Sequence, residues 1–181
     1  MSLIEKFGGV VKTHGLPQTR LHVLAKQGST SAIFSSIAYA VNQARAGKTI
    51  LITDLPRSEL IQAFMAADLF VFASNIEYSP LVLFESVAAG TPFLTVDVGN
   101  ALEIAEWTGA GLACTSIRDA RGYTRVDEAV LGQKMTALMT EPELLRELAD
   151  TGRKNWCDKF TLEKVCARYE SLFRELDETR T

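Results

Sequence analysis

Short apolar runs alternate with amphipathic segments along the chain as far as residue 115. Short apolar runs are typical of buried strands, and such runs occupy 21–25, 49–53, 69–74, 92–96 and 111–115. The run at 49–53 is also rich in β-branched residues. Elsewhere apolar residues recur with the spacing of one helical face, which predicts helices over 2–15, 29–47, 57–68, 79–90 and 100–107. The sequence therefore predicts an α/β fold, a doubly wound, Rossmann-like parallel sheet.

From residue 116 onward the pattern predicts no further strand and three C-terminal helices, over 125–139, 142–160 and 161–176. The last helix has an apolar face, which consists of Leu162, Val165, Cys166, Tyr169, Leu172 and Phe173. We expect this face to pack inward, with part of it more exposed than is usual for a core helix. No repeat, low-complexity segment or linker divides the chain, so we expect one domain.

The composition is that of an ordinary globular protein and excludes several kinds of site. Of the 181 residues 47% are hydrophobic and 23% are charged, and the net charge of −3 gives no sign of a nucleic acid or anionic membrane partner. The three cysteines form no CxxC pair, and the two histidines have no acidic residues at ligand spacing, so neither disulfides nor a metal site is indicated. No apolar segment is long enough to span a membrane and no signal peptide is recognisable. We expect a cytoplasmic location, with membrane association of the full-length protein left open.

The helix predicted over 79–90 contains a carboxylate among apolar residues. Its boundaries are marked by Ser79 as the expected N-cap, Pro80 at the first helical position and Gly90 past the end. Glu85 has only apolar neighbours one turn away in either direction, and a carboxylate is rarely buried without a partner. The spacing alone leaves two interpretations open, a solvated glutamate on an exposed stripe or a functional one.

A second carboxylate, Glu77, stands in the loop before this helix. Taken alone it is most simply an ordinary loop residue. The backbone N–H groups of Leu81 and Val82 lie at the helix N-terminus, where the helix dipole favours an anion. The stretch therefore offers an anion site beside two carboxylates, and a nucleotide sugar has both the phosphates and the hydroxyl groups to fill it.

The segment "ADLFVFASNIEYSPLVLFESVAAGTPF", residues 67–93, resembles the signature of the group 1 family of retaining glycosyltransferases with the GT-B fold. In that family a glutamate, seven residues and a second glutamate precede a Gly-x-Pro turn, as Glu77, Glu85 and Gly90-Thr91-Pro92 do here. The segments "ILITDLPRSELIQAFMAAD", "VDVGNALEIAE" and "KFTLEKVCARYESLF" are also similar to family elements, so that the resemblance covers about residues 49–173.

The resemblance implies a donor site and assigns roles to its residues. Glu77 would be the catalytic residue beside the donor sugar, and Glu85 would bind the ribose hydroxyls. The amides around Ser79, Leu81 and Val82 would hold the diphosphate and the sugar. Leu55 would offer backbone groups to the base. The implied reaction transfers a sugar from a nucleoside diphosphate to a glycan, lipid or small-molecule acceptor with retention of configuration, with no metal and no cofactor.

The chain also departs from the family pattern. Tyr78 and Pro80 stand where the family has glycines, and Ala73-Ser74 replaces a Pro-Ser pair. We expect residues 1–181 to form the single donor-nucleotide lobe, with the N-terminal acceptor lobe and the first strand of this lobe, which carries an Arg and a Lys for the diphosphate, absent. Lys26 is a candidate phosphate contact outside the motif. The isolated chain is then expected to be inactive. A nucleotide-sugar epimerase lobe, or a non-catalytic nucleotide- or partner-binding module, is the alternative.

Overall fold

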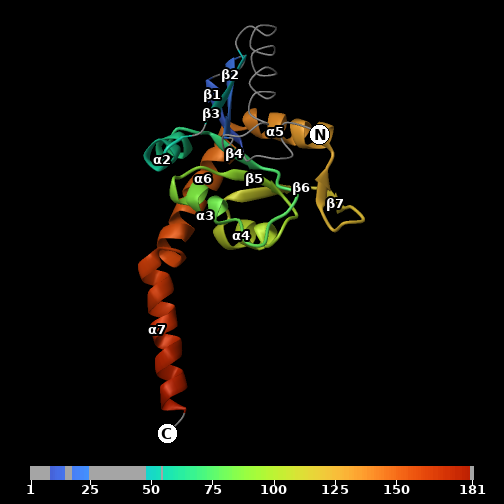
Figure 1. Ribbon diagram of the computed structural model, residues 1–181. Coiled ribbons are helices and arrows are strands. Elements are labelled where there is room, and N and C mark those ends of the chain that lie inside the picture. Colours follow the sequence, from blue (N-terminus) through green and yellow to red (C-terminus); the bar gives the residue numbers. More distant parts are fainter. Residues whose placement is uncertain (1–8, 15–17, 25–47, 54, 180–181) are drawn as a thin grey trace.

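The computed structural model of the protein describes residues 9–14, 18–24, 48–53 and 55–179 (Figure 1). In chain order its elements are β1 (Gly9–His14), β2 (Gln18–Leu24), β3 (Lys48–Thr53), α2 (Arg57–Met65), β4 (Leu69–Phe72), α3 (Leu81–Ala88), β5 (Phe93–Val96), α4 (Ala101–Thr108), β6 (Gly111–Cys114), β7 (Ser116–Arg118), β8 (Thr124–Val126), α5 (Glu128–Met139), α6 (Pro142–Lys159) and α7 (Leu162–Glu178). The predicted helix over 29–47 and the candidate Lys26 lie outside the described residues.

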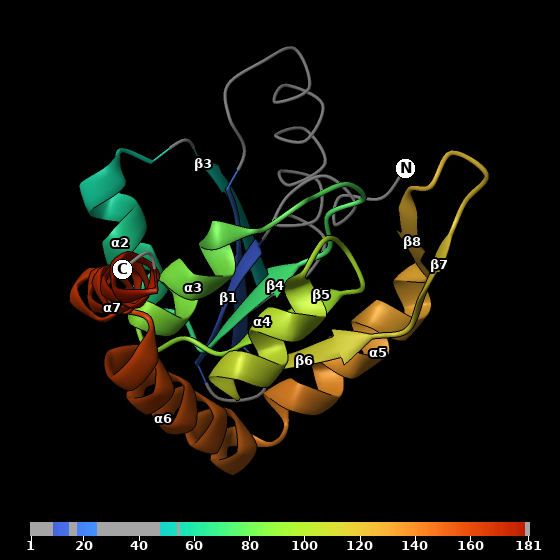
Figure 2. The same cartoon turned by 90° about the horizontal axis from the view of Figure 1, so that it is seen from below.

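The main sheet has six strands in the order β3-β2-β1-β4-β5-β6. β4, β5 and β6 are parallel to one another, and β2 is parallel to β3. Helices lie on both sides of the sheet: α4 and α5, for instance, contact opposite sides of β6 (Figure 2). The predicted α/β, Rossmann-like fold is confirmed, and all five predicted strands are present.

β1 is an exception to the parallel arrangement and corrects the predicted helix over 2–15. Residues 9–14 form a strand that pairs antiparallel with both β2 and β4, and Val10 stands opposite His22 on one side and Phe70 on the other. The physical reason is that a short β-branched apolar run also satisfies helical spacing, so periodicity alone does not separate the two structures.

The core lies between β4, β5 and the helices that follow them. All residues of β4 and β5 are buried, and α3 turns Leu83, Ser86 and Val87 into the same core. The turn after α3 is fixed by buried hydrogen bonds, since Ser86 Oγ donates to the carbonyl oxygen of Thr91 at 2.7 Å and Thr91 Oγ1 donates to that of Phe64 at 2.5 Å. These contacts fix the position of α3 on the sheet.

α6 packs against α3, α4 and α5 and closes one end of the molecule (Figure 2). Gly152 allows the close approach, because a Cβ at this position would lie 2.3 Å from the Cβ of Ala110. Arg153 donates a hydrogen bond to the carbonyl oxygen of Ala88, near the C-terminal end of α3. α6 thereby holds the C-terminal end of α3 in place.

α7 projects away from the sheet as a single long helix (Figure 1). Within α7, all of which the structure describes, no residue is buried, and Leu162 is 74% exposed. The expectation that its apolar face packs inward is therefore wrong. The pattern shows which residues share a face, but it does not show whether another element is present to cover that face.

β7 and β8 form a separate two-stranded antiparallel hairpin after β6, so the prediction of no strands beyond residue 115 is also wrong. Each strand has only three residues, and the segment between them is polar. The apolar alternation that identifies longer strands is therefore missing.

Candidate functional site

The loop between β4 and α3, residues 73–80, leaves the sheet at the carboxyl ends of the parallel strands. Ligands bind at this edge in open α/β sheets. Glu77, Tyr78 and Ser79 are exposed, with Tyr78 91% exposed. The backbone of the loop is nevertheless held in place, because the N–H of Asn100 donates to the carbonyl oxygen of Tyr78 at 3.1 Å. The predicted site residues thus stand on an exposed loop with a fixed backbone.

Gly99 lies directly against this loop. Its φ of +53° is in the left-handed region that favours glycine. A Cβ here would lie 2.4 Å from the carbonyl oxygen of Tyr78 and 2.8 Å from that of Glu77. The close approach of the two loop backbones therefore requires a glycine at this position.

The N-terminus of α3 begins one residue later than expected. Pro80, with φ −74° and ψ 88°, is the N-cap, and Leu81 is the first helical residue. Ser79 is therefore one residue too early to cap the helix, and among the described residues no side chain caps it. The backbone N–H groups of Leu81 and Val82, which have no intrahelical partner at this end, remain for a ligand.

Glu85 forms an ion pair with a residue that was not predicted from the sequence. Arg57 Nη2 lies 2.9 Å from Glu85 Oε1, and the Arg57 and Glu85 side chains are 63% and 35% exposed. The hydrogen bond to Glu85, together with the charge of Glu85, raises the pKa of Arg57. The position of Arg57 could have indicated a carboxylate partner. Arg57 is the first residue of α2, and the helix dipole disfavours a cation at a helix N-terminus unless a carboxylate is near.

An open groove of about 760 Å³ runs between α2, α3 and α6. Its lining combines Arg57, Glu85 and Leu81 with apolar side chains that include Phe84 and Trp156. Glu77, Ser79, Val82 and Leu55 do not line it. The structure therefore brings Glu85 and Leu81 together with Arg57, and it places Glu77 and Ser79 on the exposed loop before α3.

Two other predicted residues, Leu55 and Val82, are half-buried. Leu55 precedes the Pro56-Arg57 start of α2, so its backbone lies close in sequence to the residue that pairs with Glu85. Val82 is the second residue of α3. Both can contribute backbone groups to a ligand, which is the role that the resemblance implies for them.

Asn100 was not predicted as a site residue. Among the residues that the structure describes, its Oδ1 is buried yet has no hydrogen-bond partner. Asn100 is the N-cap position of α4, and its backbone N–H contacts the loop through Tyr78. A buried acceptor in this state costs free energy unless a donor reaches it. Only the structure shows this feature, because no spacing in the sequence marks it.

Neither a metal site nor a membrane span is found in the described parts of the chain. No three His, Cys, Asp or Glu side chains gather there as metal ligands would. No helix among these residues combines the length and apolar character that crossing a bilayer requires.

The comparison with known families is decisive. The sequence profile described as "Glycosyl transferases group 1" matches residues 37–155, which is more than half of the chain. The chain belongs to this family. The resemblance inferred from the two glutamates and the Gly-x-Pro turn is confirmed, and the chain corresponds to the C-terminal, Rossmann-like lobe of the GT-B fold.

Individual relatives agree with the family. The chain is 27% identical over 110 residues to N-acetyl-alpha-D-glucosaminyl L-malate synthase of Bacillus anthracis, a match that covers 61% of the chain and 26% of that protein. It is 26% identical over 164 residues to alpha-maltose-1-phosphate synthase of Mycolicibacterium smegmatis, covering 88% and 41%. The chain thus spans less than half the length of these curated relatives.

A solved structure shows the same fold. Sucrose-phosphate synthase from Thermosynechococcus elongatus superposes with a TM-score of 0.61 at 22% identity, over 87% of this chain and 38% of that one. At this level of identity the similarity concerns the fold alone.

Proposed function

We propose that the chain binds a nucleoside diphosphate sugar, of the hexosyl type, through the loop 73–80, the N-terminus of α3 and the Arg57–Glu85 pair. In the intact enzyme this site supplies the donor for transfer to an acceptor with retention of configuration. One observation supports this proposal most directly. The partly buried carboxylate of Glu85 lines an open groove, and it lies five residues after the N-cap of a helix that no described side chain caps.

The α3 N-terminus suits the diphosphate. The N–H groups of Leu81 and Val82 donate to phosphate oxygens, and the helix dipole adds a favourable potential there. Ser79 is exposed beside them and offers its hydroxyl. The N–H groups belong to the backbone at a helix end, so little ordering accompanies their binding to phosphate.

Glu85 suits the ribose. A carboxylate accepts two hydrogen bonds from a pair of vicinal hydroxyls, and such charge-assisted bonds are stronger than neutral ones. Arg57 neutralises Glu85 in the structure and leaves it accessible, since the Glu85 side chain is 35% exposed. Leu55 lies just before Arg57 in the chain and offers backbone groups to the base.

Glu77 suits the reacting end of the donor. It is exposed on the loop that precedes the phosphate-binding amides. From this place its carboxylate would contact the sugar and stabilise the positive charge that develops there when the nucleoside diphosphate leaves. The leaving diphosphate would stay bound at the α3 N-terminus.

The first experiment is a binding panel on the 181-residue chain. UDP, GDP and ADP, and the corresponding hexosyl nucleotides, are each titrated by calorimetry, and an acceptor panel is assayed for transfer in parallel. We expect binding of one nucleotide series without transfer, because the chain spans less than half of its relatives and GT-B active sites are completed by closure of two lobes. Binding of none of these nucleotides would refute the donor site, and robust transfer would refute the expected inactivity.

A further inference from the structure

The hairpin formed by β7 and β8 lies beside the carboxyl ends of the sheet strands and contacts two of their loops through Thr124. The backbone N–H of Thr124 donates to the carbonyl oxygen of Asn75, in the loop after β4, at 3.0 Å. Its Oγ1 donates to the carbonyl oxygen of Asp97, in the loop after β5, at 2.7 Å. Thr124 is 2% exposed. One buried residue therefore links the two loops that meet at the candidate site.

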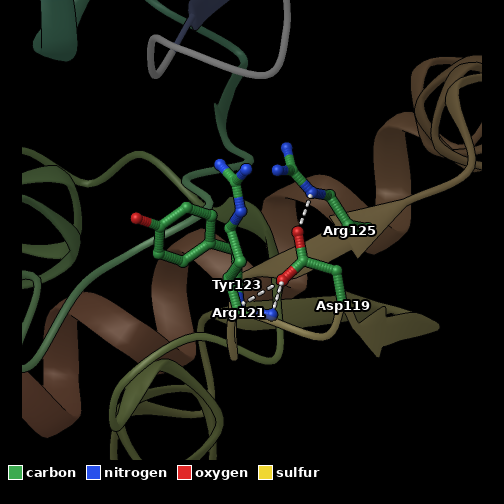
Figure 3. Close-up of polar contacts among 4 residues, drawn as sticks. All are labelled: Asp119, Arg121, Tyr123 and Arg125. Carbon is green, nitrogen blue, oxygen red and sulfur yellow. Dashed lines mark hydrogen bonds and ion pairs between the residues drawn. The ribbon is translucent and has the colours of Figure 1, made fainter.

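The hairpin itself is held by Asp119 (Figure 3). Asp119 Oδ1 accepts hydrogen bonds from the backbone N–H groups of Arg121 at 2.9 Å and Tyr123 at 3.0 Å. Asp119 Oδ2 accepts from Arg125 Nε at 3.0 Å. The Arg125 guanidinium also lies over the Tyr123 ring, 5.7 Å from its centroid. These contacts fix the tip of the hairpin and with it the position of Thr124, the residue between Tyr123 and Arg125.

Two further contacts tie the same loops together. Arg118 Nη2, at the end of β7, lies 3.8 Å from Asp97 Oδ1, so Asp97 meets the hairpin through both its side chain and its carbonyl group. In the 97–100 turn, Gly99 lies against the backbone carbonyl group of Tyr78, and the N–H of Asn100 donates to the same carbonyl oxygen. Hydrogen bonds and one ion pair therefore join the hairpin, the 97–100 turn and the loop 73–80 to one another.

We propose that the β7–β8 hairpin braces the loop 73–80 in its ligand-binding shape, with Thr124 as the positioning residue. The inference rests on the proposed donor site for its functional consequence. Thr124 itself is buried and does not contact the ligand. It acts through Asn75 and Asp97, whose carbonyl groups it holds at a fixed separation, so that Glu77 and the α3 N-terminus keep their places relative to each other.

The test compares Thr124→Val with Thr124→Ser. Valine keeps the shape but lacks the hydroxyl donor, whereas serine keeps the donor. We expect Thr124→Val to weaken binding of the best nucleotide about five- to tenfold, the loss that one hydrogen bond implies, and Thr124→Ser to restore it to within about twofold of wild type. Hydrogen exchange of the apo protein should rise at the N–H groups of Thr124 and Asn100, which donate to the loop 73–80 in the wild type, for Thr124→Val only. Thr136→Val removes a hydroxyl that donates to Gly132 on the exposed face of α5 and is the matched control.

The outcomes separate this inference from the donor site. If Thr124→Val leaves exchange at residue 124 and at Asn100 at the wild-type rate, the brace is refuted, whatever the melting temperature of the variant. If exchange rises but the wild type binds no nucleotide, the brace stands and the donor site is refuted. Should Thr124→Val fail to fold, Asp119→Asn serves instead, because it loosens the hairpin tip without touching the loop. Unchanged exchange in that variant also refutes the brace.

Discussion

Arg57 Nη2 and Glu85 Oε1 lie 2.9 Å apart and connect the first residue of α2 to the second turn of α3. Both side chains line the same groove. Exposed ion pairs contribute little to stability, so folding alone is a weak reason to place a glutamate in this otherwise apolar helix. The pair fixes a carboxylate at the groove, where a ligand hydroxyl can reach it.

The first prediction concerns Glu85→Gln. The amide keeps the shape but loses the negative charge that strengthens two hydrogen bonds to ribose, each worth roughly 1.5–3 kcal/mol before compensation. Because the amide oxygen recovers part of this, we expect nucleoside diphosphate binding to weaken about ten- to hundredfold. Calorimetry gives the dissociation constants, and thermal melts of the apo proteins should differ only slightly.

Arg57→Gln is the matched control for Glu85→Gln. It breaks the same ion pair but leaves the carboxylate in place. If the carboxylate is what binds the nucleotide, Arg57→Gln should retain most of the affinity while Glu85→Gln does not. Equal losses in both variants would mean that the ion pair, not the carboxylate, shapes the site. No loss in either would remove Glu85 from it.

The sequence was sufficient to predict the central part of the fold and the position of the loop between β4 and α3. A strong strand signal precedes the loop 73–80 and a helix signal follows it, and Gly90, with φ +82°, ends α3 as expected. The exact start of α3 was not predictable, because Pro80 suits both the cap and the first helical position, and only the observed ψ of 88° decides between them. Arg57 was missed because its partner lies 28 positions further along the chain.

The hairpin was missed for a different reason. Its strands are too short and too polar to show alternation, and its signals are local turn chemistry: Asp119 caps the turn, and Gly122 has φ +79°. Such signals show that a turn exists but not that it reaches Asn75 and Asp97. Contacts between segments far apart in sequence, which make Thr124 important, leave no periodic trace in the chain.

The second prediction concerns Gly99→Ala. The methyl group would collide with the carbonyl oxygen of Tyr78 at 2.4 Å, so the loop 73–80 must shift. Displacements of about 1 Å at a site can cost up to about a hundredfold, and we expect nucleotide binding to weaken at least about tenfold. Gly109→Ala is the control, because Gly109 also has positive φ, +65°, but lies at the end of α4, where an added methyl group would meet only the Thr151 and Asn155 side chains. It should share the backbone strain and keep most of the affinity, and equal losses would contradict the role of the contact with Tyr78.

The third prediction contrasts two helical glycines. Alanine is favoured over glycine in helices by roughly 0.8–1 kcal/mol. At Gly132 in α5 nothing lies within 4 Å of the added Cβ, so Gly132→Ala should stabilise the protein by about that amount. At Gly152 in α6 the Cβ would lie 2.3 Å from the Cβ of Ala110, so overpacking should outweigh the propensity and destabilise by about 1–3 kcal/mol. Urea unfolding of both variants measures the difference, and stabilisation by Gly152→Ala would refute the close packing of α6.

The last prediction concerns the pH dependence of the hairpin. Hydrogen bonds from the backbone N–H of Tyr123 and of Arg121, together with Arg125, hold the pKa of Asp119 below its ordinary value of 3.8. A carboxyl whose pKa is lowered by folding contributes stability that is fully present above its unfolded pKa. That stability is lost as the pH falls through the folded value. The contribution of Asp119 should therefore be complete above about pH 5 and should decline as the pH falls below about 4.

Comparison with Asp119→Asn isolates this contribution. The pKa of Asp158 is lowered by Lys154, and that of Glu163 by its own backbone N–H and by Thr161. Both residues are present in both proteins, so their effects cancel in the difference. Melting temperatures and hydrogen exchange in 116–126 are measured for both proteins from about pH 3 to about pH 7, a range that spans the ordinary carboxyl pKa. The advantage of the wild type should be constant at the upper end and shrink toward the lower end, because protonated Asp119 resembles asparagine in charge. An advantage that grows on acidification would mean that Asp119 is stabilised in its protonated form, which is the opposite of what its three donors imply.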